Sequence, residues 1–506
     1  MLSVFENYDT FTIICNLLSP RDQAALARTS SRVFQHTIPI LWYQIQGVTK
    51  LLALIPSTIF VFRPSTITLP DQNRVRLPER IDSTRLRVYA PHIRVLQIHE
   101  RPDTQCFIND TDWTKLVNLS IASPLLPNLT KLTLHWNAPH IGPTTRPWQT
   151  LFLTSSLIDL QTVSWMPPTA SALTQLTTND GLREISEVCP QLQTLAVFPF
   201  QRISFFSETE QPLYGPYISC FSQLRTLSTS LTMLQPEPFL ALSRLPYLKS
   251  LAVYASGAEP PFMRTDIAEK SFESLRRLEV HDLLPSSIEA LWSLPFVVRL
   301  TQVTFQTSFT NSDDPWLNVA RTISNRSPLI SELHLDFGIG FTPLLSNFLK
   351  HFQQTRLTTL IIDGRPQLGV TFPEFIQGLP SFLEVLKIRW ERTLMRFMPL
   401  VASHLPRLRI LAVDLTVHDT PSDKLIATAT QVVEVSGRKV PNFILQNCWE
   451  DLRIVLPDRK ESIVRVQCEF FPDMDRTVWE KRLKDENGPA LCELNQRLNQ
   501  LRHESL

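Results

Sequence analysis

The side chains with the clearest chemical potential lie in the stretch "ELHLD". Glu332, His334 and Asp336 alternate there with leucines, so an extended strand would present all three on one side. Two carboxylates and an imidazole are ligands for a metal ion, but no further histidine or cysteine is close in the sequence to complete a coordination shell. The same side chains would also make a charged strip for a protein partner. We therefore predict no metal site and interpret the stretch as part of a binding surface.

Motifs that mark enzymes do not occur in this chain. There is no Gly-x-Ser-x-Gly segment, and "DFGIG" (residues 336–340) lacks the glycine-rich loop and the His-Arg-Asp loop that accompany a kinase motif. Only 12 glycines are present, which disfavours nucleotide-binding loops. None of the cysteines has a recognisable protease context. We predict a protein that is not an enzyme, with no catalytic residues and no cofactor.

Composition and charge restrict the kinds of partner. The chain has 506 residues, of which 43% are hydrophobic and 19% charged, as expected of a folded protein. A net charge of +1 removes the main electrostatic reason to expect nucleic acid binding. No apolar run approaches the roughly 18 residues that span a bilayer, and the 7 cysteines, an odd number, disfavour a disulfide framework. With no secretion signal at the N-terminus, we expect a cytoplasmic or nuclear protein without membrane contact.

The strand around His334 belongs to a repeated pattern, apolar-x-x-apolar-x-apolar, often introduced by proline as in "PNLTKLTL". Successive copies begin 24 to 36 residues apart, at Ile93, Leu129, Leu157, Leu192, Leu224, Leu248, Leu275, Leu300, Ile330, Leu357, Leu383 and Leu408. This is the spacing of leucine-rich repeats, in which each unit supplies one strand and one return segment. We predict an α/β solenoid over residues 91–420, with parallel strands on the concave face and helices or irregular returns outside.

Alternation within each strand predicts which side chains face a partner. The apolar positions of a copy point into the core, and the residues between them point outward. On the late repeats these outward positions combine acidic and basic side chains: Glu332, His334, Asp336, Asp363, Lys387 and Arg389. Our hypothesis is that they bind a protein substrate that carries basic residues, with Arg389 as an anchor. A solvated face without a ligand is the alternative.

Three short helices are predicted before the repeats. Phe11, Ile14 and Leu18 share one face of the first helix, over residues 9–18. Ser19 caps the second helix, in which Pro20 takes the first position. The third helix is expected to end near Pro39.

These helices, followed by leucine-rich repeats, resemble an F-box protein. The resemblance rests on "LLSPRD" (residues 17–22), Leu26, "RTSSRVF" (residues 28–34) and "PILW" (residues 39–42). It implies that the hairpin binds the Skp adaptor, and through it a cullin, and that the repeats capture a substrate for ubiquitin transfer by partner subunits. The adaptor-binding residues implied are Pro20, Leu26, Phe34, Leu41 and Trp42.

The domain boundaries expected from these features are an F-box-like hairpin over 1–46, a linker or N-terminal cap over 47–90, the solenoid over 91–420, and a C-terminal cap with a terminal helix over 421–506. The Leu-Pro pair with which F-box segments usually begin does not occur in the opening residues "MLSVFENYDTFTIICNLL". The alternative is therefore a leucine-rich scaffold or inhibitor whose N-terminal helices only cap the repeats. Neither the substrate nor the biological process can be read from the sequence.

Overall fold

The structure, a computed structural model, describes residues 8–63, 72–99, 106–108, 110–136, 151–164, 179–198, 214–255, 262, 267–307, 314–337, 345–364, 372–394, 398–408 and 410–416. The chain divides into two compact units, Met1–Leu275 and Arg276–Leu506. The expected C-terminal cap over 421–506 lies outside the described residues. Among the helices that are described, none is long and apolar enough to cross a membrane.

A parallel sheet forms the centre of the first unit. Its strands follow the order β1 (Gln44–Gln46), β4 (Val95–His99), β6 (Lys131–Trp136), β7 (Asp159–Ser164), β8 (Thr194–Ala196), β9 (Thr226–Ser230) and β10 (Ser250–Tyr254). Helices α6 (Asp110–Ala122), α9 (Asn179–Val188), α10 (Gly215–Ser219) and α11 (Pro236–Ser243) lie between these strands in the chain. The sheet begins at β1, before the first leucine-rich copy, because the short strand after the hairpin pairs with β4.

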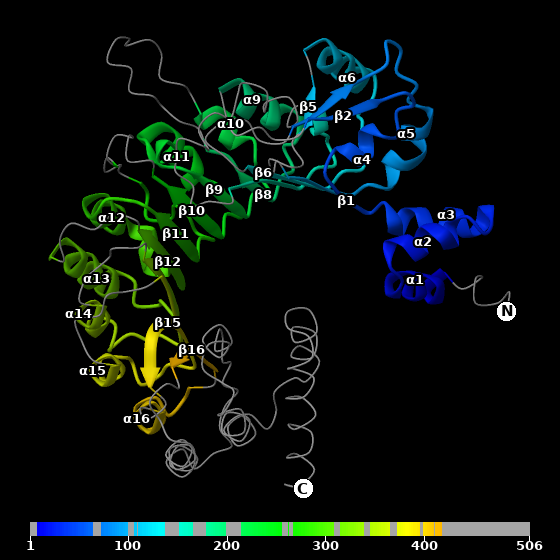
Figure 1. The fold of residues 1–506 in the computed structure, drawn as a ribbon. Helices are drawn as coiled ribbons and strands as arrows, with labels where there is room; N and C mark the ends of the chain where they lie inside the picture. Colours follow the sequence, from blue (N-terminus) through cyan, green and yellow to red (C-terminus); the bar gives the residue numbers. More distant parts are fainter. Residues whose placement is uncertain are drawn as a thin grey trace, which may run out of the picture. The chain divides into compact units, whose positions relative to one another are not determined.

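The second unit repeats the same arrangement (Figure 1). Its strands are β11 (Arg277–His281), β12 (Gln302–Thr307), β13 (Glu332–Phe337), β14 (Thr359–Gly364), β15 (Val385–Leu394) and β16 (Ile410–Thr416), which pair in this order. Helices α12 (Pro285–Trp292), α13 (Asp314–Arg326), α14 (Leu345–Lys350), α15 (Phe372–Gln377) and α16 (Met398–His404) lie on one side of these strands. Each copy of the sequence pattern leads into one strand, so the predicted α/β repeat architecture with parallel strands is confirmed.

Burial of the pattern residues explains why the copies stack. The first apolar residue of every copy, from Ile93 to Leu408, is buried, and so are inward strand residues such as Leu333 and Leu335. Each such side chain stabilises the fold by about 1.5–3 kcal/mol before the entropy cost is subtracted. One copy cannot close a core by itself, and neighbouring copies supply the missing contacts.

Backbone hydrogen bonds join each copy to the next at a fixed position. The carbonyl of Thr301 accepts from the N–H groups of Ser331 (2.9 Å) and Glu332 (3.0 Å), and the carbonyl of Ser331 accepts from those of Thr358 and Thr359. The Ser331 and Thr358 hydroxyls donate to the same carbonyls, at 3.3 and 3.1 Å. A short ladder of hydroxyls therefore accompanies the backbone bonds along these copies.

The three N-terminal helices are α1 (Tyr8–Leu17), α2 (Pro20–Ala27) and α3 (Ser31–Leu41). The Ser19 side chain accepts from the Asp22 N–H, so the predicted cap and the first position of Pro20 are confirmed. The expected end near Pro39 is wrong, because α3 continues through Pro39 to Leu41. Proline removes only one N–H from the last turn, and the N–H of Trp42 still donates to the Ile38 carbonyl at 3.0 Å.

The segment between the hairpin and the first repeats contains elements that the repeat pattern does not predict. These are the helices α4 (Thr49–Leu52) and α5 (Thr84–Tyr89) and the strands β2 (Ile59–Arg63) and β3 (Gln72–Arg76), which pair antiparallel. A third strand, β5 (Cys106–Ile108), follows the first repeat strand in the chain and pairs parallel with β3, so the three strands form a separate small sheet. The buried side chains of Val75 and Leu77 anchor this part of the chain.

Candidate functional site

The outward side chains of β11–β15 form a largely polar surface within the second unit, which we call the polar sheet face. Parallel pairing places its residues in three rows across the strands. The rows are Arg277, Gln302, Glu332 and Thr359; Glu279, Thr304, His334, Ile361 and Lys387; and His281, Gln306, Asp336 and Asp363. Neighbours within a row are about 4.8 Å apart along the sheet, so their side chains can act on one ligand together.

The predicted residues Asp336 and Asp363 are direct neighbours in the third row. His334 lies diagonally from Asp363, and its Nε2 is 2.8 Å from the Asp363 carboxylate. Both side chains of this pair remain partly exposed, at 34% and 42%. The structure thus brings together three of the predicted substrate-binding residues on two adjacent strands.

Metal binding has no support at these residues. Among the described residues, no group of three or more His, Cys, Asp and Glu side chains is arranged to hold a metal ion. His334 instead uses Nε2 for its contact with Asp363. The arrangement fixes an imidazole and a carboxylate on the face, where they can accept or donate hydrogen bonds to a partner.

Glu332 differs from the acidic residues of the third row. Its side chain is exposed, and no ion pair or side-chain hydrogen bond involves it within the described residues. An exposed carboxylate without such a contact can attract cationic side chains of a partner, because no internal ion pair has to be broken first. Lys387 is exposed on β15, and Arg389 lies farther along the same strand, although its side chain is outside the described part of the chain.

Glu279 holds a charge network at the other end of the polar sheet face. Its carboxylate lies 2.7 Å from Nε of Arg277 and 3.6 Å from Nε2 of His281. Burial acts to raise the pKa of Glu279, but His281 and the charge of Arg277 outweigh it and hold that pKa below its ordinary value. Glu279 is therefore ionised and internally neutralised at neutral pH, unlike Glu332.

The five residues that the sequence predicts for adaptor binding differ in exposure and in what they contact. Pro20 is exposed at the start of α2, while Leu26 packs against the hairpin core of Phe11, Cys15 and Val33. Phe34, Leu41 and Trp42 are half-buried on α3 and at its end. These residues do not form a single exposed surface.

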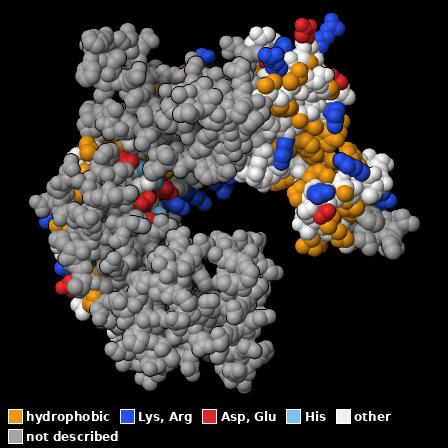
Figure 2. Space-filling view, in the orientation of Figure 1, with side chains coloured by type: hydrophobic (Ala, Val, Ile, Leu, Met, Phe, Trp, Pro, Cys, Tyr) orange, Lys and Arg blue, Asp and Glu red, His pale blue; other side chains and the backbone are white. Residues whose placement is uncertain are grey.

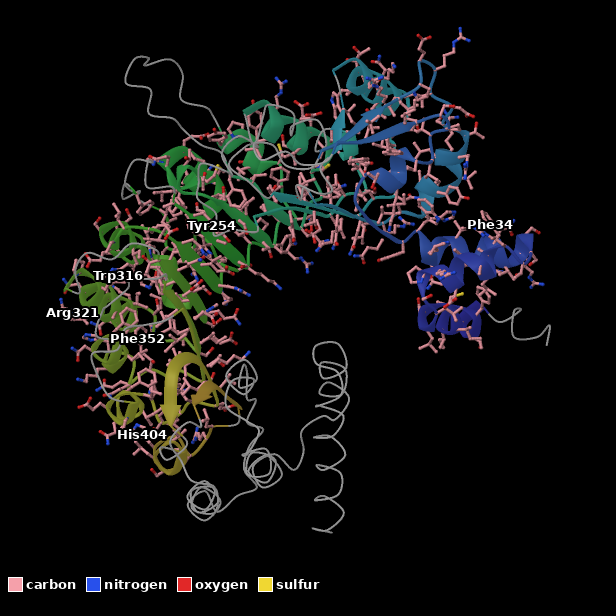
Figure 3. All side chains as sticks on the ribbon, viewed as in Figure 1. Phe34, Tyr254, Trp316, Arg321, Phe352 and His404 are labelled. Carbon is pink, nitrogen blue, oxygen red and sulfur yellow. The ribbon has the colours of Figure 1, made fainter. Side chains whose placement is uncertain are left out.

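The half-buried aromatic residues contact the start of the repeats. The Trp42 ring stacks on Tyr89 at 4.6 Å between centroids, and the Phe34 ring meets the same tyrosine edge-on at 6.3 Å. Figure 3 labels Phe34 on α3. In addition, the Tyr43 carbonyl accepts from the N–H groups of Arg94 and Val95, each at 3.0 Å. These contacts attach the hairpin to the first repeat strand.

A second apolar surface of the hairpin is exposed. Ile13, Ile14 and Leu17 on α1 are exposed by 62%, 37% and 82%, whereas Phe11 and Cys15 of the same helix are buried. Figure 2 shows hydrophobic side chains on this part of the molecule. A helix that is apolar on two sides requires two partners, and only one of them is the hairpin core. We call Ile13, Ile14 and Leu17 the α1 surface.

Sequence reasoning missed the α1 surface because it assigned Ile14 to the inner face together with Phe11. The signal was present as two apolar stripes on one helix, with Phe11 and Cys15 on one stripe and Ile13 and Leu17 on the other. The α1 surface and the polar sheet face are thus the candidate binding sites among the described residues. A scan of the chain against protein-family models and a search of curated proteins both found no match.

Proposed function

We propose that this chain is the substrate-recognition subunit of a cullin-type ubiquitin ligase. In this proposal the N-terminal hairpin is an F-box that binds the Skp adaptor, and the polar sheet face of the repeats binds a protein substrate. The chain itself does no covalent chemistry. It raises the effective concentration of the substrate near the ubiquitin carrier held by the partner subunits.

The observation that supports adaptor binding is the α1 surface. A helix that only capped the repeats would bury its apolar residues against its own chain, yet Leu17 is 82% exposed. Exposed clustered apolar side chains mark protein interaction sites. The hairpin also has the capping serine and the N1 proline of α2 in place, which positions α1 and α2 relative to one another. Gln23 reinforces this by donating from Nε2 to the Cys15 carbonyl at 2.7 Å.

The observation that supports substrate binding is the uncompensated charge of Glu332 beside His334, Asp336 and Asp363. Rows of alternating polar side chains on a parallel sheet offer an extended, rigid surface of the kind that repeat proteins use for ligands. The acidic side chains suit a substrate segment with basic residues.

A second candidate function is a leucine-rich scaffold or inhibitor without a ligase role. The stacking of Trp42 on Tyr89 favours it, because a terminal cap would make this contact with its own repeats. The two functions differ in whether the α1 surface has a partner.

The test is direct binding of the purified full chain to the Skp adaptor, measured by biolayer interferometry. We expect the wild type to bind and Leu17→Asp to weaken binding at least about tenfold. Leu17 makes few contacts at 82% exposure, so the free energy of unfolding should be unchanged. Leu26→Asp would be a poor variant, since Leu26 packs on the hairpin core and its loss would confuse folding with binding.

Ile121→Asp is the matched control, because Ile121 is 78% exposed on α6 of the same unit and lies outside the hairpin. It should bind the adaptor like the wild type. Absence of binding by the wild type, or equal losses for Leu17→Asp and Ile121→Asp, would reject the ligase function and leave the scaffold.

A further inference from the structure

The small sheet of the first unit has an open edge. Its strand order is β2-β3-β5, so among the described strands β2 pairs only with β3. Alternate N–H and C=O groups of an edge strand point away from its neighbour and can pair with another strand. The β2 residues before Arg63 are apolar, and Ile59 and Val61 are exposed by 57% and 38%.

The two faces of this sheet differ. Val75, opposite Phe60 in the β2–β3 pairing, is buried at 2% and marks the inner face, which Phe60 covers only in part because it is itself 39% exposed at the edge. Ile59 and Val61 lie on the outer face, and their partners across the pairing are Arg76 and Arg74. An apolar edge strand therefore lies beside a strand that carries arginines.

Further arginines follow β3 in the chain. Between residues 72 and 94 the sequence contains the acidic residues Glu79 and Asp82 and the arginines Arg74, Arg76, Arg80, Arg85, Arg87 and Arg94. The side chains of Arg76, Arg80, Arg85 and Arg87 are exposed, and within the described residues none of these four makes an ion pair or a side-chain hydrogen bond. Lys115 and Lys131 of the same unit are, in contrast, paired with aspartates at 2.7 Å.

These arginines outnumber the acidic residues of the segment, so residues 72–94 carry an excess of positive charge, and Arg76 brings part of it to the strand beside β2. Figure 2 shows Lys and Arg side chains standing among hydrophobic ones on the described N-terminal part of the molecule. We define the β2 surface as Ile59, Val61 and Arg76, with the strand edge of β2 as its border.

We propose that the β2 surface docks an extended, acidic segment of a partner protein, which adds a strand to the edge of β2. The backbone of the segment would supply hydrogen bonds, and its apolar side chains would cover Ile59 and Val61. Strands lie about 4.8 Å apart, so an added strand would lie about 10 Å from β3. Arginine and glutamate side chains together span that separation, which places partner carboxylates within reach of Arg76.

Charge selects this occupant over the alternatives. A second copy of the chain would bring Arg63, Arg74 and Arg76 of each protomer together, and like charges oppose that pairing. A single-stranded nucleic acid is held mainly by stacking of its bases on aromatic side chains, whereas Ile59 and Val61 on the outer face are aliphatic and the aromatic Phe60 lies on the opposite face. An acidic polypeptide meets both the strand edge and the positive charge. The proposal does not depend on adaptor binding, since the α1 surface and the β2 surface share no residue.

The experiment measures fluorescence anisotropy of a labelled peptide that alternates glutamate with valine, titrated with the full-length protein. We expect saturable binding that Arg76→Glu weakens at least about tenfold. Ile59→Asp, at a mostly exposed position, should weaken binding similarly through lost apolar contact and repulsion of the peptide. Unfolding midpoints should show that both variants remain folded, and the variant that does so carries the test if the other does not.

Two controls define the mode of binding. Arg225→Glu changes an exposed arginine of the same unit that lies outside the β2 surface, and this variant should bind the peptide like the wild type. A peptide with proline in place of valine keeps the charge but loses alternate N–H donors, and it should bind at least about tenfold more weakly.

Several outcomes would overturn the proposal. They are no binding by the wild type, equal losses for Arg76→Glu and Arg225→Glu, or undiminished binding of the proline peptide. Tighter binding of a single-stranded oligonucleotide, lost with Arg76→Glu, would assign the surface to nucleic acid. Self-association that Ile59→Asp abolishes would assign it to a second copy.

Discussion

Glu279 shows how one residue sets the charge balance of the polar sheet face. Its carboxylate is only 20% exposed and is held between Arg277 and His281. The same side chain that would be costly to bury alone is stabilised here by the Arg277 guanidinium and by the His281 ring beside it. Glu332, two strands away in the sheet, has no ion pair with any described residue and is exposed to a partner.

We expect Glu279→Gln to lower the free energy of unfolding at pH 7 by about 1 kcal/mol, because it removes a charge-assisted contact of 2.7 Å that is only partly shielded from solvent. The pKa of Glu279 is lower in the folded protein than in the unfolded chain. The ionised side chain therefore adds fully to the free energy of unfolding above the ordinary glutamate pKa of about 4.3, and this stabilisation is lost as the pH falls through the pKa of the folded state. Urea denaturation at pH 7 and at successively lower pH measures this. The wild-type advantage should shrink below about pH 4.3.

Glu289→Gln provides the comparison at the same scale. Glu289 lies on α12, and no ion pair or side-chain hydrogen bond involves it among the described residues. Its variant should show no pH-dependent difference from the wild type. A pH-independent loss for Glu279→Gln would mean that packing, not charge, accounts for its effect.

The N-terminal hairpin shows how an element is held between two partners. Its core consists of Phe11, Cys15 and Val33, and Trp42 stacks on Tyr89 of α5. Strand β1 then enters the repeat sheet and ends at Gly47, whose φ of 78° suits glycine and few other residues. The Gly47 N–H donates to the Gln97 carbonyl at 2.7 Å. The hairpin is thereby continuous with the first repeat strand, while the α1 surface remains exposed.

Tyr89→Ala should weaken this attachment. It removes the ring that meets both Trp42 and Phe34, and we expect a loss of about 2 kcal/mol in the free energy of unfolding, with faster amide exchange in α1–α3. Hydrogen exchange followed by mass spectrometry locates the change.

The control for Tyr89 is Tyr247→Ala, because Tyr247 is 50% exposed and makes no ring contact among the described residues. It should cost less than about 0.5 kcal/mol. If exchange in α1–α3 stayed at the wild-type rate in Tyr89→Ala, the aromatic contact would not be what attaches the hairpin.

At the scale of the whole molecule, the two surfaces of the proposed function belong to different units. The α1 surface lies in Met1–Leu275 and the polar sheet face in Arg276–Leu506. Repeat proteins transmit local changes mainly to neighbouring repeats. Changes at residues without shared partners usually add independently.

We therefore expect the double variant Glu332→Lys/Asp336→Lys to lose affinity for a labelled peptide that alternates lysine with serine, by at least about tenfold, and to bind the adaptor like the wild type. Leu17→Asp should instead bind the adaptor more weakly and bind the peptide like the wild type. Anisotropy with the peptide and interferometry with the adaptor measure the two affinities on the same preparations.

Glu289→Lys is the control for charge reversal within the second unit, since it changes a helix residue rather than the sheet face. If Glu289→Lys lowered the peptide affinity as much as the double variant does, the effect would come from net charge alone. The polar sheet face would then no longer be assigned as the peptide-binding site. Adaptor binding that fell with the double variant would show coupling between the units.

The sequence determined the repeat architecture and the outward residues of its strands. Period-2 alternation within each copy decides which side chains are buried, and the spacing of the copies leaves room for one return segment. These local rules were sufficient to predict that Glu332, His334 and Asp336 share one side of a strand. The capping serine of α2 is equally local, since it needs only the next turn of the helix.

Only the tertiary structure decided what these residues contact. The pairing of His334 with Asp363 depends on the register of two strands separated by a whole repeat, and the contact of Trp42 with Tyr89 depends on how the hairpin meets the first repeats. The same holds for α1, whose two apolar stripes could not be assigned to inside or outside until α2 and α3 had packed against one of them. Local patterns define the faces of an element, but long-range packing determines which face remains exposed to a partner.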